Sequence, residues 1–98
     1  MIVSAWKGAT YGIRVGSINA RKYFNQDWET IEVEIDRKFY TFNLSSTFWM
    51  TCPEFRGGPI PNWLKKQSLI PWPKGKPPRF ELAPLKGNKF RLNDITSK

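Results

Sequence analysis

The sequence predicts a mainly β domain with one or two short helices, arranged as a small half-open barrel of six or seven mostly antiparallel strands. Three observations lead to this fold class. Short segments of alternating apolar and polar residues recur, glycine and proline separate them at close intervals, and only one segment has clear helical spacing of its apolar residues. The length of 98 residues suits a single domain, residues 1–98, with one core.

The first part of the chain is expected to form two strands, at residues 2–6 and 10–15, with glycines marking their ends. Residues 17–24 lose the alternation. We therefore expect one helical turn there, with Ser17 or Asn19 as its N-cap. This turn would connect the first strand pair to the rest of the sheet.

Residues 30–44 carry the clearest local pattern. Ile31, Val33 and Ile35 alternate with acidic residues, which is typical of a strand buried on one face. A turn is expected at residues 36–38, and the alternation resumes after it. The pattern therefore predicts an antiparallel hairpin.

The segment after the hairpin, residues 45–52, is expected to prolong the sheet as far as Pro53. A short amphipathic helix is expected at residues 60–67, because its apolar residues recur at spacings of three and four and Pro61 falls in its first turn. Its lysines would then point outward.

The last third begins with the segment PWPKGKPP at residues 71–78, whose four prolines exclude regular hydrogen-bonded structure and favour extended geometry. Two closing strands are expected at 79–85 and 89–93, joined by a turn. The aromatic side chains assigned to the core are Phe24, Trp28, Trp63 and Phe80, and Cys52 is given a small apolar packing role.

The chain carries 16 Lys and Arg against 8 Asp and Glu, a net charge of +8, and the surplus is uneven. Residues 1–26 have a net charge of +4, residues 27–54 of −4 and residues 55–98 of +8. Charge that serves only solubility is more often mixed along a chain. The distribution therefore predicts a polyanionic partner, with nucleic acid the leading candidate.

Several kinds of catalysis are excluded by composition. The chain has no histidine and one cysteine, so histidine-dependent acid/base chemistry, catalytic triads and cysteine–histidine zinc sites are ruled out. It also lacks the glycine-rich loops that hold nucleotide phosphates. We therefore expect no enzymatic activity, no cofactor and no metal site.

A metal-dependent nuclease is kept as a minor alternative. Asp27 together with Asp36-Arg37-Lys38 resembles the carboxylate and lysine pattern that holds Mg²⁺ in such enzymes. These residues flank a predicted tight turn, however, where aspartate is common for its own backbone hydrogen bonds.

No secretory signal is predicted at the start of the sequence, and no apolar run reaches the ~20 residues that span a bilayer. The expectation is a cytoplasmic chain without membrane contact. A single cysteine agrees with a reducing compartment.

Two clusters and one basic segment are the candidates for nucleic-acid binding, because Arg and Lys bind phosphates, Asn and Arg read base edges, and aromatic rings stack on bases. One cluster follows the second strand, one follows the hairpin, and the basic segment surrounds the proline-rich residues. The candidate residues are Arg14, Ser17, Asn19, Arg21 and Lys22; Ser45, Ser46, Thr47, Trp49 and Arg56; and Lys74, Lys76 and Arg79. A solvated surface is the alternative reading of the first cluster and of the basic segment, and core packing is the alternative for Trp49.

The order of elements resembles the DNA-binding pseudobarrel of plant auxin-response-type transcription factor domains and of the effector domains of certain restriction endonucleases. The matching stretches are Tyr11-Gly12-Ile13-Arg14-Val15 leading to Tyr23-Phe24, the hairpin at 30–44, and residues 60–69 before Phe80-Glu81-Leu82. The resemblance covers most of the chain.

This resemblance implies two arms that grip the major groove of DNA: Ser17, Asn19, Arg21 and Lys22 in one, and residues 45–49 in the other. Duplex DNA is therefore the favoured partner. Binding of single-stranded nucleic acid or RNA on a barrel face with aromatics such as Tyr40, Trp49 and Trp72 is an alternative. Another is a protein-interaction module that uses the proline-rich loop. A protein partner or a separate catalytic subunit stays open.

Overall fold

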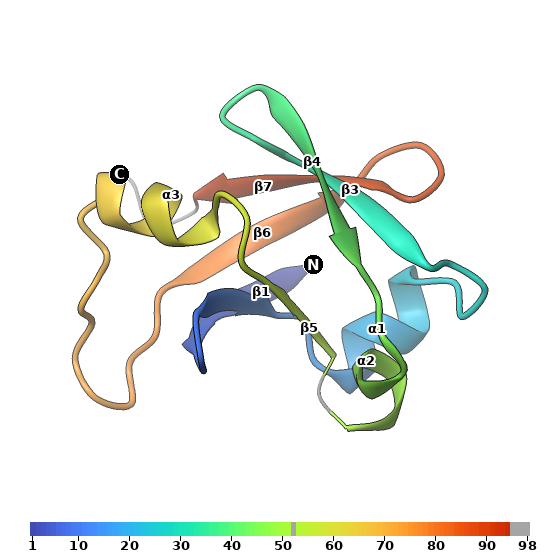
Figure 1. Cartoon of the computed structure of the whole chain (residues 1–98), viewed down its shortest axis with the longest axis horizontal. Helices are drawn as coiled ribbons and strands as arrows, with labels where there is room; N and C mark the ends of the chain where they lie inside the picture. Colours follow the sequence, from blue (N-terminus) through green and yellow to red (C-terminus); the bar gives the residue numbers. More distant parts are fainter. Residues whose placement is uncertain (52, 95–98) are drawn as a thin grey trace.

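The computed structural model of this protein describes residues 1–51 and 53–94, which form seven strands and three short helices. The strands are β1 (Ile2–Lys7), β2 (Tyr11–Arg14), β3 (Thr30–Ile35), β4 (Lys38–Asn43), β5 (Glu54–Arg56), β6 (Arg79–Pro84) and β7 (Lys89–Asp94). The helices are α1 (Ser17–Tyr23), α2 (Ser46–Met50) and α3 (Ile60–Lys66). The predicted fold class is confirmed, since one sheet curls into a nearly closed barrel (Figure 1).

The sheet has the strand order β4-β3-β7-β6-β1-β2-β5, so β4 and β5 are its two edges. Every pairing is antiparallel except that of β3 with β7. The edges face each other across a cavity of about 250 Å³, and the rings of Phe42 and Phe55 pack 4.8 Å apart between these two strands. The barrel is therefore closed by side chains at this seam and not by a ladder of backbone hydrogen bonds.

The core lies inside the barrel and takes one face of every strand. The hairpin shows the principle, because Ile31, Val33 and Ile35 are buried while the residues between them are half-buried. Phe24, Trp63 and Phe80 are also buried, as predicted, whereas Trp28 is half-buried and packs on the core from its edge. The role assigned to Cys52 lies outside the described residues.

The hairpin turn is confirmed at Asp36 and Arg37, whose φ values of 52° and 70° are those of a two-residue turn that suits the twist of an antiparallel pair. The helix at 60–67 is also confirmed, with Pro61 in its first turn and Trp63 and Leu64 buried.

Two predictions are wrong. Residues 45–52 were expected to prolong the sheet, but residues 46–50 form α2, because the chain must pass from one edge of the barrel to the other and has no strand to pair with on the way. Neither Ser17 nor Asn19 caps α1. Gly16 stands at the N-cap with a φ of 87°, which a residue with a side chain rarely adopts.

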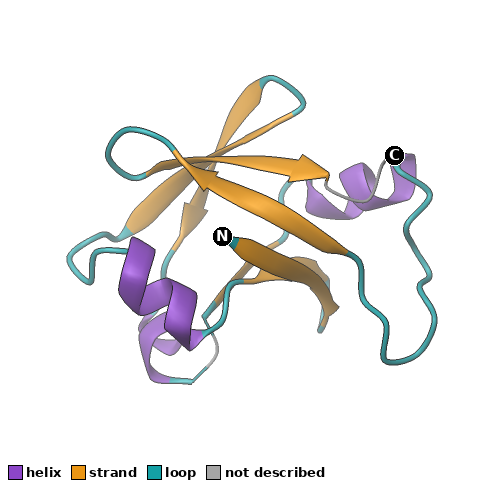
Figure 2. Ribbon diagram, turned by 180° about the vertical axis from the view of Figure 1, so that it is seen from behind, coloured by secondary structure: helices purple, strands orange, loops and turns teal. Residues whose placement is uncertain are grey.

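The helices lie at two ends of the barrel. In both views α1 and α2 are side by side at one end, and α3 is at the other with the long proline-rich loop that leads to β6 (Figures 1 and 2). The ring of Phe24, just after α1, packs 5.2 Å from that of Phe48 in α2. No helix within the described ranges is long and apolar enough to cross a membrane.

Candidate nucleic-acid interface

The strand register brings together three arginines that are far apart in the sequence. Ser4 of β1 lies opposite Arg14 of β2 on one side and opposite Arg79 of β6 on the other, while Arg56 of β5 lies opposite Gly12 of β2. The residues between them are in the core, so these positions point outward. Arg14, Arg56 and Arg79 therefore share the outer face of β6, β1, β2 and β5.

Trp6 supports two of these arginines. The guanidinium carbons of Arg14 and Arg56 lie 5.5 Å and 5.8 Å from the centre of its ring. Gly12 makes room for this arrangement, since a Cβ there would come within 2.8 Å of the indole nitrogen and 2.6 Å of the Arg56 Cβ. The indole face attracts both cations and reduces the freedom of their long side chains.

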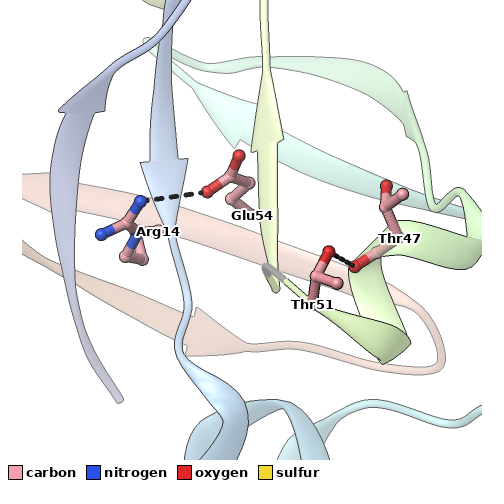
Figure 3. A network of polar contacts seen from close by, with 4 residues as sticks. All are labelled: Arg14, Thr47, Thr51 and Glu54. Carbon is pink, nitrogen blue, oxygen red and sulfur yellow. Dashed lines mark hydrogen bonds and ion pairs between the residues drawn. The ribbon is translucent and has the colours of Figure 1, made fainter.

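Glu54 moderates the charge of this face. Its carboxylate oxygen Oε1 forms an ion pair with Nη2 of Arg14 (Figure 3), at a distance of 3.5 Å. The side chain of Glu54 is only 12% exposed, against 53% for that of Arg14. Arg56 and Arg79 have no carboxylate within ion-pairing distance in residues 1–51 and 53–94. Two of the three arginines on the face are thus free to meet an outside anion.

The two predicted arms meet at the α1 and α2 end. A cavity of about 110 Å³ is lined by Ser17 and Arg21 from α1 and by Trp49 from α2, together with Ala20, Gln26 and Pro53. Arg21 and Lys22 are exposed. Trp49 is half-buried, with its ring 5.0 Å from that of Phe48 in an edge-on contact. The clusters at 17–22 and 45–49 are therefore neighbours in space.

The side chain of Asn19 has a structural role in the same region. Its Nδ2 donates hydrogen bonds to the carbonyl oxygens of Ile2 at 2.9 Å and Val15 at 3.0 Å, and so fastens α1 to β1 and to the residue that follows β2. Because these bonds occupy its amide donors, we leave Asn19 out of the binding surface.

The polar side chains around α2 contact one another and the nearby backbone. The hydroxyls of Ser45 and Thr47 lie 2.6 Å apart, and the hydroxyl of Thr51 donates to the carbonyl oxygen of Thr47 (Figure 3). Ser45, Ser46 and Thr47 are all exposed. Ser45 and Thr47 also line the cavity at the seam between β4 and β5.

The proline-rich loop is fastened at both ends beside the β1–β2 turn. The ring of Trp72 packs edge-on at 5.6 Å from that of Tyr11, and the backbone nitrogen of Ala5 donates to the carbonyl oxygen of Pro78. The loop reverses at Gly75, which leaves Lys74 and Lys76 exposed on either side. The absence of helix and strand predicted for residues 71–78 is confirmed, whereas the extended geometry is interrupted by the turn at Lys74-Gly75, where the backbone nitrogen of Lys76 donates to the carbonyl oxygen of Pro73.

These groups adjoin because β2 runs from the base of the loop to the start of α1. We call them together the basic band, which runs from the α1 and α2 end, across the outer face of the barrel, to the proline-rich loop. Its residues are Lys7, Arg14, Arg21, Lys22, Arg56, Lys74, Lys76 and Arg79. Lys7 belongs to the loop end of the band, since its Nζ lies 5.7 Å from the centre of the Tyr11 ring, on which Trp72 packs.

The acidic hairpin does not share this surface. Glu32 and Glu34 of β3 lie opposite Lys89 and Arg91 of β7, and Nε of Arg91 donates to Glu34 at 2.8 Å. The negative charges of Glu32 and Glu34 in the hairpin are thus partly neutralised on another part of the barrel.

Sequence reasoning missed Trp6, Gly12, Glu54 and Lys7. The alternation of β1 contained a signal for Trp6, because placing Val3 and Ala5 in the core leaves Trp6 on the outer face. Its contacts with arginines of β2 and β5 depend on the order of the strands in the sheet. The alternation within β1 does not reveal that order.

The carboxylates of the nuclease alternative lie on turns. Asp27 and Asp36 are exposed, and the backbone nitrogen of Asp27 bonds to the side chain of Asn25. Among residues 1–51 and 53–94 no three acidic or cysteine side chains gather in a way that could hold a metal ion.

Comparison with protein-family models, curated proteins and solved structures gives no match to this chain.

Proposed function

We propose that this chain is a non-catalytic binding domain for double-stranded DNA and that the basic band contacts the phosphate backbone. The observation that carries the proposal is the gathering of Arg14, Arg56 and Arg79 on one outer face, with two of them held against Trp6. Guanidinium groups suit this task because they donate two parallel hydrogen bonds to phosphate oxygens.

The cations of the basic band are also spread widely enough to contact several phosphates of a duplex. Cations stand at the α1 and α2 end, in the middle of the strands and at the proline-rich loop, so a polyanion lying along β2 would meet positive charge over the width of the barrel. Neutralising several phosphates at once releases counterions, and this drives association at low salt.

Duplex DNA is favoured over single strands because the aromatic rings near the band are already in contact with protein. Trp6 faces two arginines, Trp49 lies against Phe48, and Trp72 lies against Tyr11. Tyr40, Trp49 and Trp72 are half-buried, so burial alone does not decide the single-strand alternative. Stacking on unpaired bases requires open aromatic faces, which supports the duplex.

The proposal is tested by comparing the double variant R14A/R56A with the matched control R37A/R91A, which removes the same charge from the β3, β4 and β7 part of the barrel. Fluorescence anisotropy with a labelled duplex is measured from low to physiological salt. We expect R14A/R56A to bind at least about tenfold more weakly at low salt. The slope of log K against log salt should become shallower by about one to two, because each phosphate contact contributes about one and Arg14 is partly neutralised by Glu54.

The control should bind like the unchanged protein. An equal loss in both variants would show that only total charge matters, and absence of a complex at low salt with the unchanged protein would overturn the proposal. A single strand that outcompetes the duplex would overturn the choice of DNA form.

A further inference from the structure

Two apolar side chains stand out on the surface. Ile18 of α1 and Met50 of α2 are each 79% exposed, against 50% for Ile2 and 47% for Phe39, the other large hydrophobic residues that are exposed in the described ranges. Single exposed apolar residues are ordinary. These two lie on neighbouring helices at the same end of the barrel, at one end of the basic band.

Their immediate neighbours are polar or positively charged. Ile18 shares a face of α1 with Arg21 and Lys22, three and four residues further on, both of them exposed. Met50 ends α2, whose exposed residues Ser46 and Thr47 precede it by four and three positions. At this end of the barrel, the exposed side chains of Ile18 and Met50 are thus surrounded by positively charged groups and hydroxyls.

A partner that complements such a surface has negative charge around small apolar groups. The DNA major groove has this character, because phosphates form its edges and the C5-methyl of thymine is an apolar group on its floor. A lipid surface fits less well, since interfacial anchoring uses a helix with a continuous apolar face and these short helices offer single tips.

We propose that Ile18 and Met50 contact the 5-methyl groups of pyrimidines in the major groove. This inference rests on the proposed function and adds what the α1 and α2 end recognises. Thymine and 5-methylcytosine carry the same group at the same position, so both are ligands of this chemistry.

The experiment uses pairs of duplexes that differ only in that methyl group. In one pair, alternating A and T is compared with the same sequence containing deoxyuridine in place of thymidine; in the other, cytosine is compared with 5-methylcytosine. The unchanged protein, the double variant I18A/M50A and the control F39A are measured by anisotropy at low salt. Phe39 is a matched control because it is an exposed apolar residue on β4, outside the band.

We expect the unchanged protein and F39A to bind the methylated member of each pair about fourfold more tightly for each methyl contacted, the factor that burial of one such group implies. In I18A/M50A the ratio should fall to about one, while binding of the deoxyuridine duplex is kept. Circular dichroism of the variant checks that the fold is retained, and both side chains are so exposed that alanine should not disturb it.

Equal binding of both members of each pair by the unchanged protein would overturn the inference and leave the proposed function intact. A ratio that persists in I18A/M50A would also overturn it, because the methyl groups would then act through duplex shape. Binding to vesicles containing phosphatidylserine that is lost in I18A/M50A, with no methyl preference, would replace DNA by a membrane at this end. If no duplex binds at low salt, the proposed function itself fails.

Discussion

At the scale of single residues, the outer face is organised around Trp6. The indole holds two guanidinium groups, Gly12 provides the space, and Glu54 restrains Arg14 from the neighbouring strand. A carboxylate that is 12% exposed beside a cation that is 53% exposed keeps one positive charge partly neutralised. Glu54 is therefore expected to weaken the attraction of this face for phosphates.

Replacing Glu54 by glutamine tests this. The variant E54Q should bind duplex DNA several-fold more tightly at low salt, because Arg14 is released and the face gains one positive charge. The matched control is E34Q, which breaks the ion pair of 2.8 Å between Glu34 and Arg91 on the outer face of β3 and β7. Titration by anisotropy should show a much smaller gain for E34Q, and an equal gain would mean that the position of the charge is irrelevant.

At the scale of elements, the β3–β4 hairpin shows how local sequence and backbone geometry agree only in part. The alternation of its strands suits the sheet, but the turn places Asp36 and Arg37 at positive φ, where glycine and asparagine are preferred. An arginine in this conformation is held there by the pairing of the flanking strands.

The variant R37G should therefore raise the free energy of unfolding by about 0.5–1 kcal/mol, since glycine adopts this conformation without steric cost. Its control is K38G one residue on, within β4, where glycine should lower the free energy of unfolding by a similar amount. Urea unfolding of the two variants measures both changes. A loss of stability in R37G would show that the arginine makes a compensating contact.

At the scale of the whole molecule, the fold brings together basic segments that lie far apart in the sequence. The basic residues before position 23 come together with Arg56, Lys74, Lys76 and Arg79 because β1 and β2 lie between β6 and β5, whereas β3 and β7 pair acidic with basic residues elsewhere. The surplus positive charge, +8 for the whole chain, is thus concentrated on one surface of the barrel.

This arrangement predicts a steep salt dependence of duplex binding. If most of the basic band contacts phosphates, the slope of log K against log salt should lie at about −5 to −7, because each contact contributes about −0.9. Affinities measured over a range of salt concentrations give this slope directly. A slope shallower than about −2 would mean that few of these cations meet the duplex.

The sequence by itself determined the fold class, the hairpin, α3, the two closing strands and the residue types of the surface. It could do so because period-two alternation, helical spacing and proline positions act locally. It also pointed to most members of the basic band, since charge can be counted without a structure.

Only the tertiary structure decided how these pieces meet. Residues 46–50 became a helix because of where the barrel edges lie, and Trp6 joined Arg14 and Arg56 because of strand order and register. The physical reason is that neighbours across a sheet are set by pairings between distant segments, and these depend on how the whole core packs.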